Sequence, residues 1–216
     1  PDWYYLAGSN KCGMGYREVN WSLPRDRQIL LGRQNIFDGT WWKAPSMGWM
    51  FVPLTEYQGG GAAATLEPLS EHLDAYEAHL KQNFTSGVQA CYRGPRLYDT
   101  DETKTVVKKW VDFYKSHRAI LDSDVIHVRR PDGRDIDCIL HVNPGLETKG
   151  LAVVHNPLAC DVEKELTLPL YYTGLTRKAK IAERDGKSKR YELDRGYNVT
   201  IPLRMSPNST TWFVIE

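Results

Sequence analysis

The sequence lacks an excess of charge of either sign. Its 216 residues include 28 basic and 27 acidic side chains, so the formal net charge at neutral pH is +1. Proteins that bind nucleic acid or an anionic membrane surface usually carry a strongly basic field, and this composition does not supply one. We therefore expect neither nucleic acid nor a membrane among the partners of this chain.

Long apolar runs are also missing. A membrane-spanning helix needs roughly 20 consecutive apolar residues, and a secretory leader needs a basic segment followed by an apolar one. The sequence has neither pattern, and its first residues, PDWYYL, already have the composition of a core-forming strand without an initiator Met. We expect a soluble chain that is a fragment or a processed product of a longer protein, called the parent protein below.

Cysteine is scarce, and its spacing excludes the common cysteine motifs. The chain has 4 cysteines, at Cys12, Cys91, Cys138 and Cys160, which are too far apart for a CxxC metal or redox motif. We expect buried free thiols. The 6 histidines show no spacing typical of a metal site, so we expect no metal and no other cofactor.

The first half of the sequence alternates short apolar segments with segments of helical period. The apolar segments cover 3–7, 48–54 and 87–92, and the helical ones cover 25–37, 66–84 and about 100–121. Asp99 and Glu102 resemble a capping box before the third helix. Repeated strand, loop and helix units favour parallel strands with right-handed crossovers. Because a closed (β/α) barrel needs eight units and about 250 residues, these units predict its last part only.

The second half has the pattern of an all-β domain. Short apolar runs are separated by turn signals such as PDG, NPG and DG, which favour an antiparallel β-sandwich. The predicted strands cover 125–129, 135–142, 150–155, 162–170, 179–183, 189–193, 198–203 and 211–215. Trp212 and Phe213 on the last strand are expected in its core. The predicted domains are a partial barrel at 1–122 and a sandwich at 123–216.

Three loops of the first domain carry the candidate site. The carboxyl ends of parallel strands share one edge of a sheet, where ligands of such folds bind. Carboxylates, guanidinium groups and exposed aromatic rings suit a sugar, which has many hydroxyls and apolar C–H faces. The candidate substrate-binding residues are Tyr16, Arg17, Tyr57, Gln58, Arg93, Arg96 and Tyr98, and the candidate catalytic carboxylates are Glu56 and Glu18.

Each of these assignments has a plainer alternative. Glu56 has the strongest functional case, because it stands alone just after an apolar strand and beside three consecutive glycines. Arg93 and Arg96 can instead pair with acids at the rim of the sheet. Asp99 is better interpreted as a helix cap than as a catalyst.

A dinucleotide site is a further alternative for the glycine loop. The run GGGAAA at 59–64 satisfies the G-x-G-x-x-G/A fingerprint. That fingerprint requires its first glycine directly after a strand. Residues 55–58 intervene here, so we favour the carbohydrate interpretation.

The order of the units, with the segments YRGPRLYDTDETKTVVKKWVDFYKSHRAIL and SDVIHVRRPDGRDIDCILHVNP before a terminal β region, resembles the C-terminal part of large bacterial glycoside hydrolases of the α-galactosidase-like type. The resemblance extends over essentially the whole chain. It implies a catalytic barrel followed by a β-sandwich, with the family's catalytic carboxylates on middle and later barrel strands. It also favours a secreted or periplasmic location for the parent protein.

Together, these patterns predict the last units of a glycosidase barrel and its C-terminal sandwich. Glycoside hydrolysis needs two carboxylates about 5 to 9.5 Å apart, so we expect a chain that is inactive without the missing N-terminal part. A noncatalytic carbohydrate-binding or structural module is the alternative. A nucleotide-dependent enzyme is the third possibility.

Overall fold

The computed structural model describes residues 16–17, 23–42, 49–55 and 65–216. The chain divides into two compact units, Pro1–Arg118 and Ala119–Glu216. The domain boundary predicted from the sequence, 122/123, falls a few residues later, just after helix α4 (Asp101–Leu121). No helix in the described part of the chain is both long enough and apolar enough to cross a membrane.

The first unit contains a parallel sheet with strand order β1-β2-β3. Its strands are β1 (Tyr16–Arg17), β2 (Trp49–Pro53) and β3 (Gln89–Arg93). Each is followed by helical structure, namely α2 (Arg25–Trp42), then η2 (Leu69–His72) with α3 (Leu73–Thr85), then α4. The strand-then-helix alternation and the parallel pairing predicted from the sequence are therefore confirmed for β2 and β3. The first predicted strand, 3–7, lies outside the described residues. The three described strands form an open sheet, as expected for part of a barrel.

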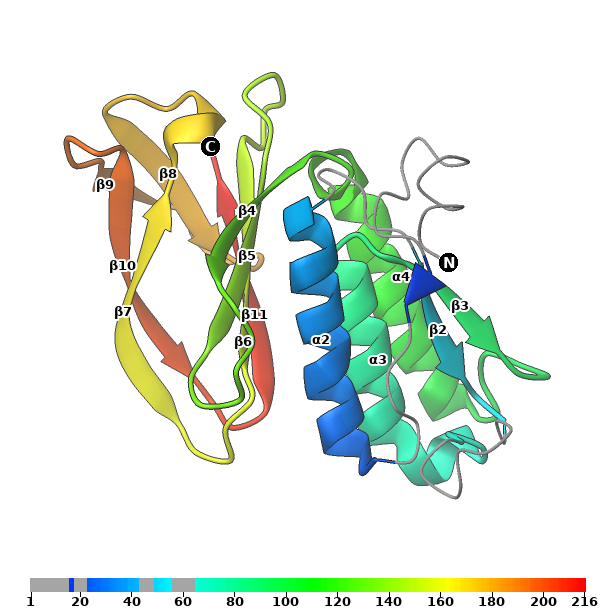
Figure 1. Ribbon diagram of the computed structural model, residues 1–216. Helices are drawn as coiled ribbons and strands as arrows, with labels where there is room; N and C mark the ends of the chain where they lie inside the picture. Colours follow the sequence, from blue (N-terminus) through cyan, green and yellow to red (C-terminus); the bar gives the residue numbers. More distant parts are fainter. Residues whose placement is uncertain (1–15, 18–22, 43–48, 56–64) are drawn as a thin grey trace. The chain divides into compact units, whose positions relative to one another are not determined.

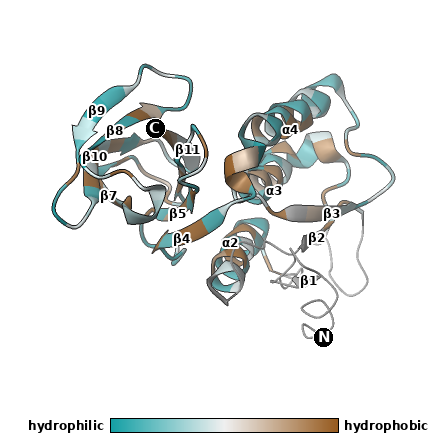
Figure 2. Cartoon of the chain, turned by 90° about the horizontal axis from the view of Figure 1, so that it is seen from above, coloured by the Kyte–Doolittle hydropathy of each residue, from teal (hydrophilic) through white to brown (hydrophobic). Residues whose placement is uncertain are grey.

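Helices α2, α3 and α4 lie side by side on one face of this sheet (Figure 1). Figure 2 shows the same layer from above, with many hydrophilic residues along α4. Gly32 of α2 lies close to α3, where a Cβ would come within 2.6 Å of Nε2 at the end of the Gln82 side chain. The layer buries Tyr76 and Leu80 of α3 and Trp110 of α4. One helical layer on a parallel sheet is the arrangement of a barrel wall.

A half-buried, hydrogen-bonded carboxylate joins α3 to α4. Oε1 of Glu77 accepts hydrogen bonds from Nζ of Lys109, at 2.8 Å, and from the indole Nε1 of Trp110, at 2.9 Å. Burial raises the pKa of Glu77, but these donors and the positive charge of Lys109 outweigh it, so the pKa is lower than usual. Glu77 therefore stays ionised, and its carboxylate stays hydrogen-bonded to Lys109 and Trp110.

The predicted cap of α4 is wrong by one position. The backbone N–H of Thr103 donates to Oγ1 of Thr100, at 3.2 Å, and the N–H of Thr100 donates back to Oγ1 of Thr103, at 3.0 Å. This reciprocal pair is the capping box, and it replaces the predicted pair of Asp99 and Glu102. A Thr hydroxyl both donates and accepts, so two threonines can close a box as well as an acidic pair can.

The second unit is an antiparallel β-sandwich. One sheet has the strand order β4-β5-β6-β11-β8-β9, and β10 pairs with β7 in the other. The bounds are β4 (Asp124–Arg129), β5 (Asp137–Val142), β6 (Gly150–Asn156), β7 (Val162–Pro169), β8 (Lys178–Glu183), β9 (Lys189–Glu192), β10 (Asn198–Met205) and β11 (Ser209–Ile215). Every strand predicted for this region is present. The predicted fold class, partial barrel followed by sandwich, is confirmed.

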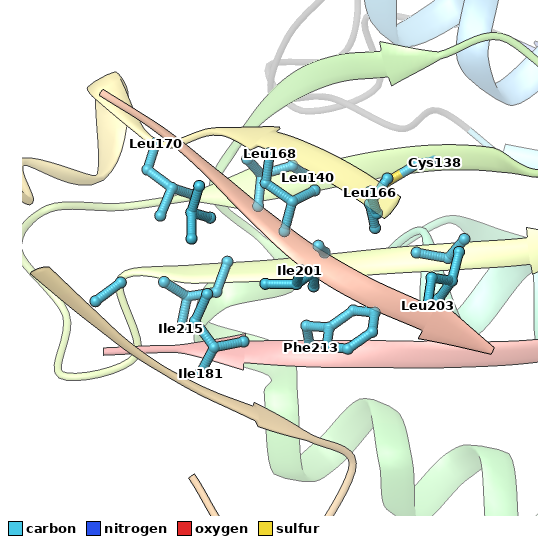
Figure 3. Close-up of a cluster of buried hydrophobic side chains, with 14 of the residues drawn as sticks. Cys138, Leu140, Leu166, Leu168, Leu170, Ile181, Ile201, Leu203, Phe213 and Ile215 are labelled. Carbon is cyan, nitrogen blue, oxygen red and sulfur yellow. The ribbon is translucent and has the colours of Figure 1, made fainter. Parts of the chain in front are cut away.

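Side chains from both sheets form the core of the sandwich (Figure 3). Leu168 of β7 and Ile201 of β10 lie opposite Leu140 of β5 and Phe213 of β11 in this cluster. Trp212, which was also expected there, is only half-buried. Successive residues of a strand point to opposite faces, so adjacent residues of β11 cannot both enter one core.

Of the two cysteines whose burial the structure describes, one is as expected and one is not; Cys12 and the side chain of Cys91 lie outside the described part. Cys138 is a buried free thiol of this core, and burial raises the pKa of its thiol. Cys160 is also free, but it is exposed. It follows β6 in the connection to β7.

Candidate functional site

The carboxyl ends of β2 and β3 meet at one edge of the parallel sheet. Arg93 lies in register with Pro53, and the backbone N–H of Leu54 donates to the carbonyl oxygen of Arg93 at 2.8 Å. The two loops that leave this edge therefore begin side by side. This is the edge at which the sequence predicts a ligand site.

The loop after β2 has a closed base. The carbonyl oxygen of Leu54 accepts hydrogen bonds from the backbone N–H of Glu67, at 2.7 Å, and from Oγ1 of Thr65, at 3.0 Å. Nη2 of Arg25, at the start of α2, holds the carbonyl oxygen of Thr65 at 2.9 Å. The two ends of the segment between Thr55 and Thr65 are therefore joined by hydrogen bonds.

The glycine loop and three candidate residues fall between the joined ends. Glu56, Tyr57 and Gln58, followed by the run of glycines, lie outside the described residues, as does Glu18. Their roles stay predictions. The structure describes what comes directly before and after them, namely Thr55 and Thr65.

The loop after β3 packs closely on Leu54, where those two ends are joined. A Cβ at position 94 would lie 2.6 Å from the Cβ of Leu54, so only glycine allows this approach. Two residues later, Arg96 pairs with Glu67: its Nε donates to Oε1 at 3.2 Å and its Nη2 donates to Oε2 at 2.9 Å. Such a two-point contact fixes direction as well as distance.

Two more contacts hold the same loop. The carboxylate of Asp99 accepts hydrogen bonds from the backbone N–H of Ser70, at 3.0 Å, and from its hydroxyl, at 3.2 Å. The pKa of Asp99 is lower than usual, because these bonds and one from Thr103 outweigh the opposing effect of desolvation. The buried hydroxyl of Tyr76 donates to the carbonyl oxygen of Leu97 at 2.9 Å. Asp99 thus positions the loop, in addition to its contact with the helix cap.

The tip of this loop presents apolar surface beside the charged pair. Leu97 and Tyr98 are both exposed, and they are the only exposed large hydrophobic residues in the described part of the first unit. The ammonium group of Lys104 lies 5.6 Å from the centre of the Tyr98 ring. An exposed ring next to charged hydrogen-bonding groups has the properties that a sugar needs from its binding surface.

Only part of the predicted site comes together at this edge. Arg93, Arg96 and Tyr98 follow β3 there, and all three are exposed. Tyr16 and Arg17, predicted in a loop, instead form β1. Their partners in β2 are Trp49 and Met50, at its amino end, so about four residues of strand, roughly 13 Å, separate them from the carboxyl edge. The loop prediction failed because the register of so short a strand depends on pairing with β2.

The sequence interpretation missed the residues that position the loops. Glu67, Ser70 and Gly94 are the partners of the β3 loop, and none was singled out. No local pattern pointed to the pairing of Glu67 with Arg96, because Glu67 lies beyond the glycine loop that follows β2. Among the described residues, no group of three or more His, Cys, Asp or Glu side chains could hold a metal ion.

The sequence matches no protein-family model, and it matches no curated protein. Solved structures do share its fold. The GH36 alpha-galactosidase AgaA from Geobacillus stearothermophilus, in complex with raffinose, matches 87% of this chain with a TM-score of 0.54 and 18% identity. Alpha-galactosidase I from Mortierella vinacea matches 86% with a TM-score of 0.52 and 11% identity. A variant of AmyP in complex with maltotriose matches 89% with a TM-score of 0.51 and 11% identity.

The chain spans less than half of each of these structures. The match covers 24% of AgaA, 44% of the Mortierella enzyme and 48% of AmyP. The chain therefore has the fold of a part of these proteins, and the resemblance noted in the sequence is confirmed at the level of the fold.

Proposed function

We propose that the chain is the C-terminal portion of a glycoside hydrolase that acts on carbohydrate. Its first unit supplies the last three β/α units of the catalytic barrel, and its second unit is the sandwich that follows the barrel. The observation that carries the proposal is that each structural match runs through both units, over 86% to 89% of the chain. Two of the matched proteins hold a sugar in their crystals.

The edge formed by β2 and β3 is the proposed contribution of this chain to the substrate site. Active sites of (β/α) barrels lie at the carboxyl ends of the strands, and the described loops there are braced by the Arg96–Glu67 pair. Glu56 and Glu18 are the two candidates for the one carboxylate that this chain is proposed to supply, with Tyr57, Gln58, Arg93 and Tyr98 against the substrate. Glu67, whose carboxylate is paired with Arg96, is a positioning residue rather than an acid or base.

The second carboxylate of the reaction is proposed to come from the preceding part of the parent protein. Two carboxylates must flank the scissile bond, one as acid and the other as nucleophile or base. The match to longer enzymes supports an arrangement in which earlier strands carry one of them. An isolated three-unit sheet then binds sugar without turning it over.

Hydrolysis of aryl glycosides tests the proposal. We compare the 216-residue chain with a protein extended upstream through the earlier barrel units, using aryl α-galactosides and aryl α-glucosides. Turnover by the extended protein and none by the chain supports the proposal. Turnover by the chain alone contradicts the fragment assignment. Sugar binding without turnover by the extended protein supports the noncatalytic module instead, and NAD(P) binding supports the nucleotide-dependent enzyme.

A further inference from the structure

Three tyrosines gather at one end of the sandwich. Tyr171 and Tyr172 lie in η3 (Tyr171–Thr173), between β7 and β8, and Tyr197 lies in the turn between β9 and β10. Their rings are in contact: the centres of Tyr171 and Tyr172 are 5.1 Å apart at 89°, and those of Tyr171 and Tyr197 are 5.3 Å apart at 73°. These three residues are called the tyrosine platform below.

Two rings of the platform are exposed, and Tyr197 is half-buried. Tyr171 keeps 60% of its surface accessible and Tyr172 keeps 61%, more than any other large hydrophobic side chain in the described residues. In the described part of the sandwich unit they are also the only exposed large hydrophobic side chains. Three neighbouring rings, two of them exposed, are too small an apolar patch for a protein partner, because such interfaces present several hundred Å² of contiguous apolar surface. A small ligand fits the size of the patch better.

The two connections that carry the platform are fixed to each other. The backbone N–H of Leu170 donates to the carbonyl oxygen of Tyr197 at 2.9 Å, directly beyond the last pair of the β7–β10 ladder. Both connections lie at the same end of the sandwich in Figure 1. Gly174 ends η3 with a φ of 76°, and its N–H donates to the carbonyl oxygen of Tyr171. The rings therefore stand on a rigid base.

Tyr197 has a backbone conformation that its side chain disfavours. Its φ is 61°, in the left-handed region that bulky residues rarely adopt. The turn imposes this conformation, because Oδ1 of Asp194 accepts hydrogen bonds from the N–H groups of Gly196, at 2.7 Å, and Asn198, at 2.8 Å. Glycine or asparagine would adopt this conformation at lower cost. A tyrosine kept there despite the cost points to a role for its ring, because such strain collects at ligand sites.

The chemistry of the platform suits a sugar. Each ring offers a flat apolar face for the C–H groups of a pyranose, and each hydroxyl can donate and accept a hydrogen bond. Perpendicular rings let one face stack on the sugar while a neighbouring hydroxyl reaches its edge. We propose that the tyrosine platform is a carbohydrate-binding site on the sandwich. This site is separate in sequence from the β2–β3 edge, and it holds whether or not the parent protein hydrolyses glycosides.

Calorimetric titration of the full 216-residue chain tests this site. The probes are maltotriose, raffinose and soluble polysaccharides built from the same sugars. Wild-type chain is expected to bind at least one of them, and Tyr171→Ala/Tyr172→Ala is expected to weaken binding by about tenfold or more, with an unchanged melting temperature. Tyr197→Asn keeps the turn and removes one ring, so it should weaken binding without loss of stability.

Two control variants separate the platform from other sites. Arg204→Ala removes an exposed charge of β10, paired only with the exposed Glu163 at 2.7 Å, and should bind sugar like wild type. Arg96→Ala alters the β2–β3 edge. The platform proposal is overturned if no probe binds the chain, or if the double tyrosine variant binds like wild type. Binding lost in Arg96→Ala and kept in the tyrosine variants would assign the sugar to the β2–β3 edge instead.

Discussion

Arg96 and Glu67 form a two-point ion pair between the loops that follow β3 and β2. The two donor–acceptor distances are 3.2 and 2.9 Å, and the arginine side chain is 51% exposed whereas the glutamate is 17% exposed. Exposed pairs add little to the free energy of folding, because water screens them and their side chains lose entropy. The pair therefore matters for loop geometry more than for stability.

Arg96→Lys in the parent protein tests this role. Lysine keeps the charge but loses the fork that reaches both carboxylate oxygens. We expect kcat/KM for aryl glycosides to fall by about tenfold to a hundredfold, because small displacements of substrate-facing loops are costly. The urea midpoint should hardly change. Lys108→Ala is the control, since Lys108 pairs with Asp112 on the exposed side of α4. Equal activity of Arg96→Lys and wild type would remove the positioning role.

Gly94→Ala is expected to destabilise the first unit. The new Cβ would lie 2.6 Å from the Cβ of Leu54, whose side chain is fully buried at the end of β2. Overpacking of this kind costs about 1 to 3 kcal/mol, which urea unfolding of the chain would measure. Gly145→Ala is the matched control, because its nearest neighbour is Oδ1 of Asn143 at 3.3 Å. Unchanged stability of Gly94→Ala would mean that the two loops are not packed as described.

His79 is expected to make the chain sensitive to acid. Burial lowers the pKa of its imidazole from 6.5 to about 4, so the folded state keeps the ring neutral. The unfolded state binds a proton below pH 6.5, and the folded state does so only near pH 4. The contribution of His79 to the free energy of unfolding is therefore fully present above pH 6.5. It falls by roughly 3 kcal/mol as the pH drops to 4.

The matched variant is His79→Leu, which fills a similar volume without a titrating group. Urea midpoints measured from pH 7.5 to pH 4 should fall less steeply for this variant than for wild type. Parallel curves for the two proteins would show that the burial of His79 does not set the acid response.

The strand pattern of the sandwich could be predicted from the sequence because each strand is short, alternating and bounded by turn residues. In β10, Val199, Ile201 and Leu203 are buried and the residues between them are exposed. The same alternation explains the error at Trp212, because Phe213 already occupies the core position. Local period and turn chemistry were sufficient for these elements.

The loop contacts of the first unit could not be predicted in the same way. The approach of Gly94 to Leu54 and the contact of Asp99 with Ser70 join residues on different loops. They depend on the register of β3 against β2, which no local pattern encodes. The position of Tyr16 and Arg17 at the amino end of the sheet has the same cause. The sequence therefore predicted which kinds of residue lie at the carboxyl edge of the parallel sheet, but it did not predict which residues they contact.

The sandwich is expected to fold by itself. Among the described residues, its core cluster contains side chains from both sheets and none from the first unit, and Leu168 in it is fully buried. A chain of residues 123–216 should unfold in one cooperative transition, and Leu168→Ala should lower its stability by about 2 to 5 kcal/mol. Circular dichroism during urea unfolding checks both results. An unfolded 123–216 chain, or a folded one that tolerates Leu168→Ala, would contradict two independent cores.

Whether the carboxyl edge of β2 and β3 faces the substrate is tested most directly by the turnover of the parent protein carrying Glu56→Gln. The substitution keeps the shape of the side chain and removes its charge. If Glu56 is the acid or base, kcat for aryl glycosides should fall by at least about 10²-fold with an unchanged melting temperature. A Glu56→Gln parent with the full wild-type kcat would contradict the catalytic assignment at this edge.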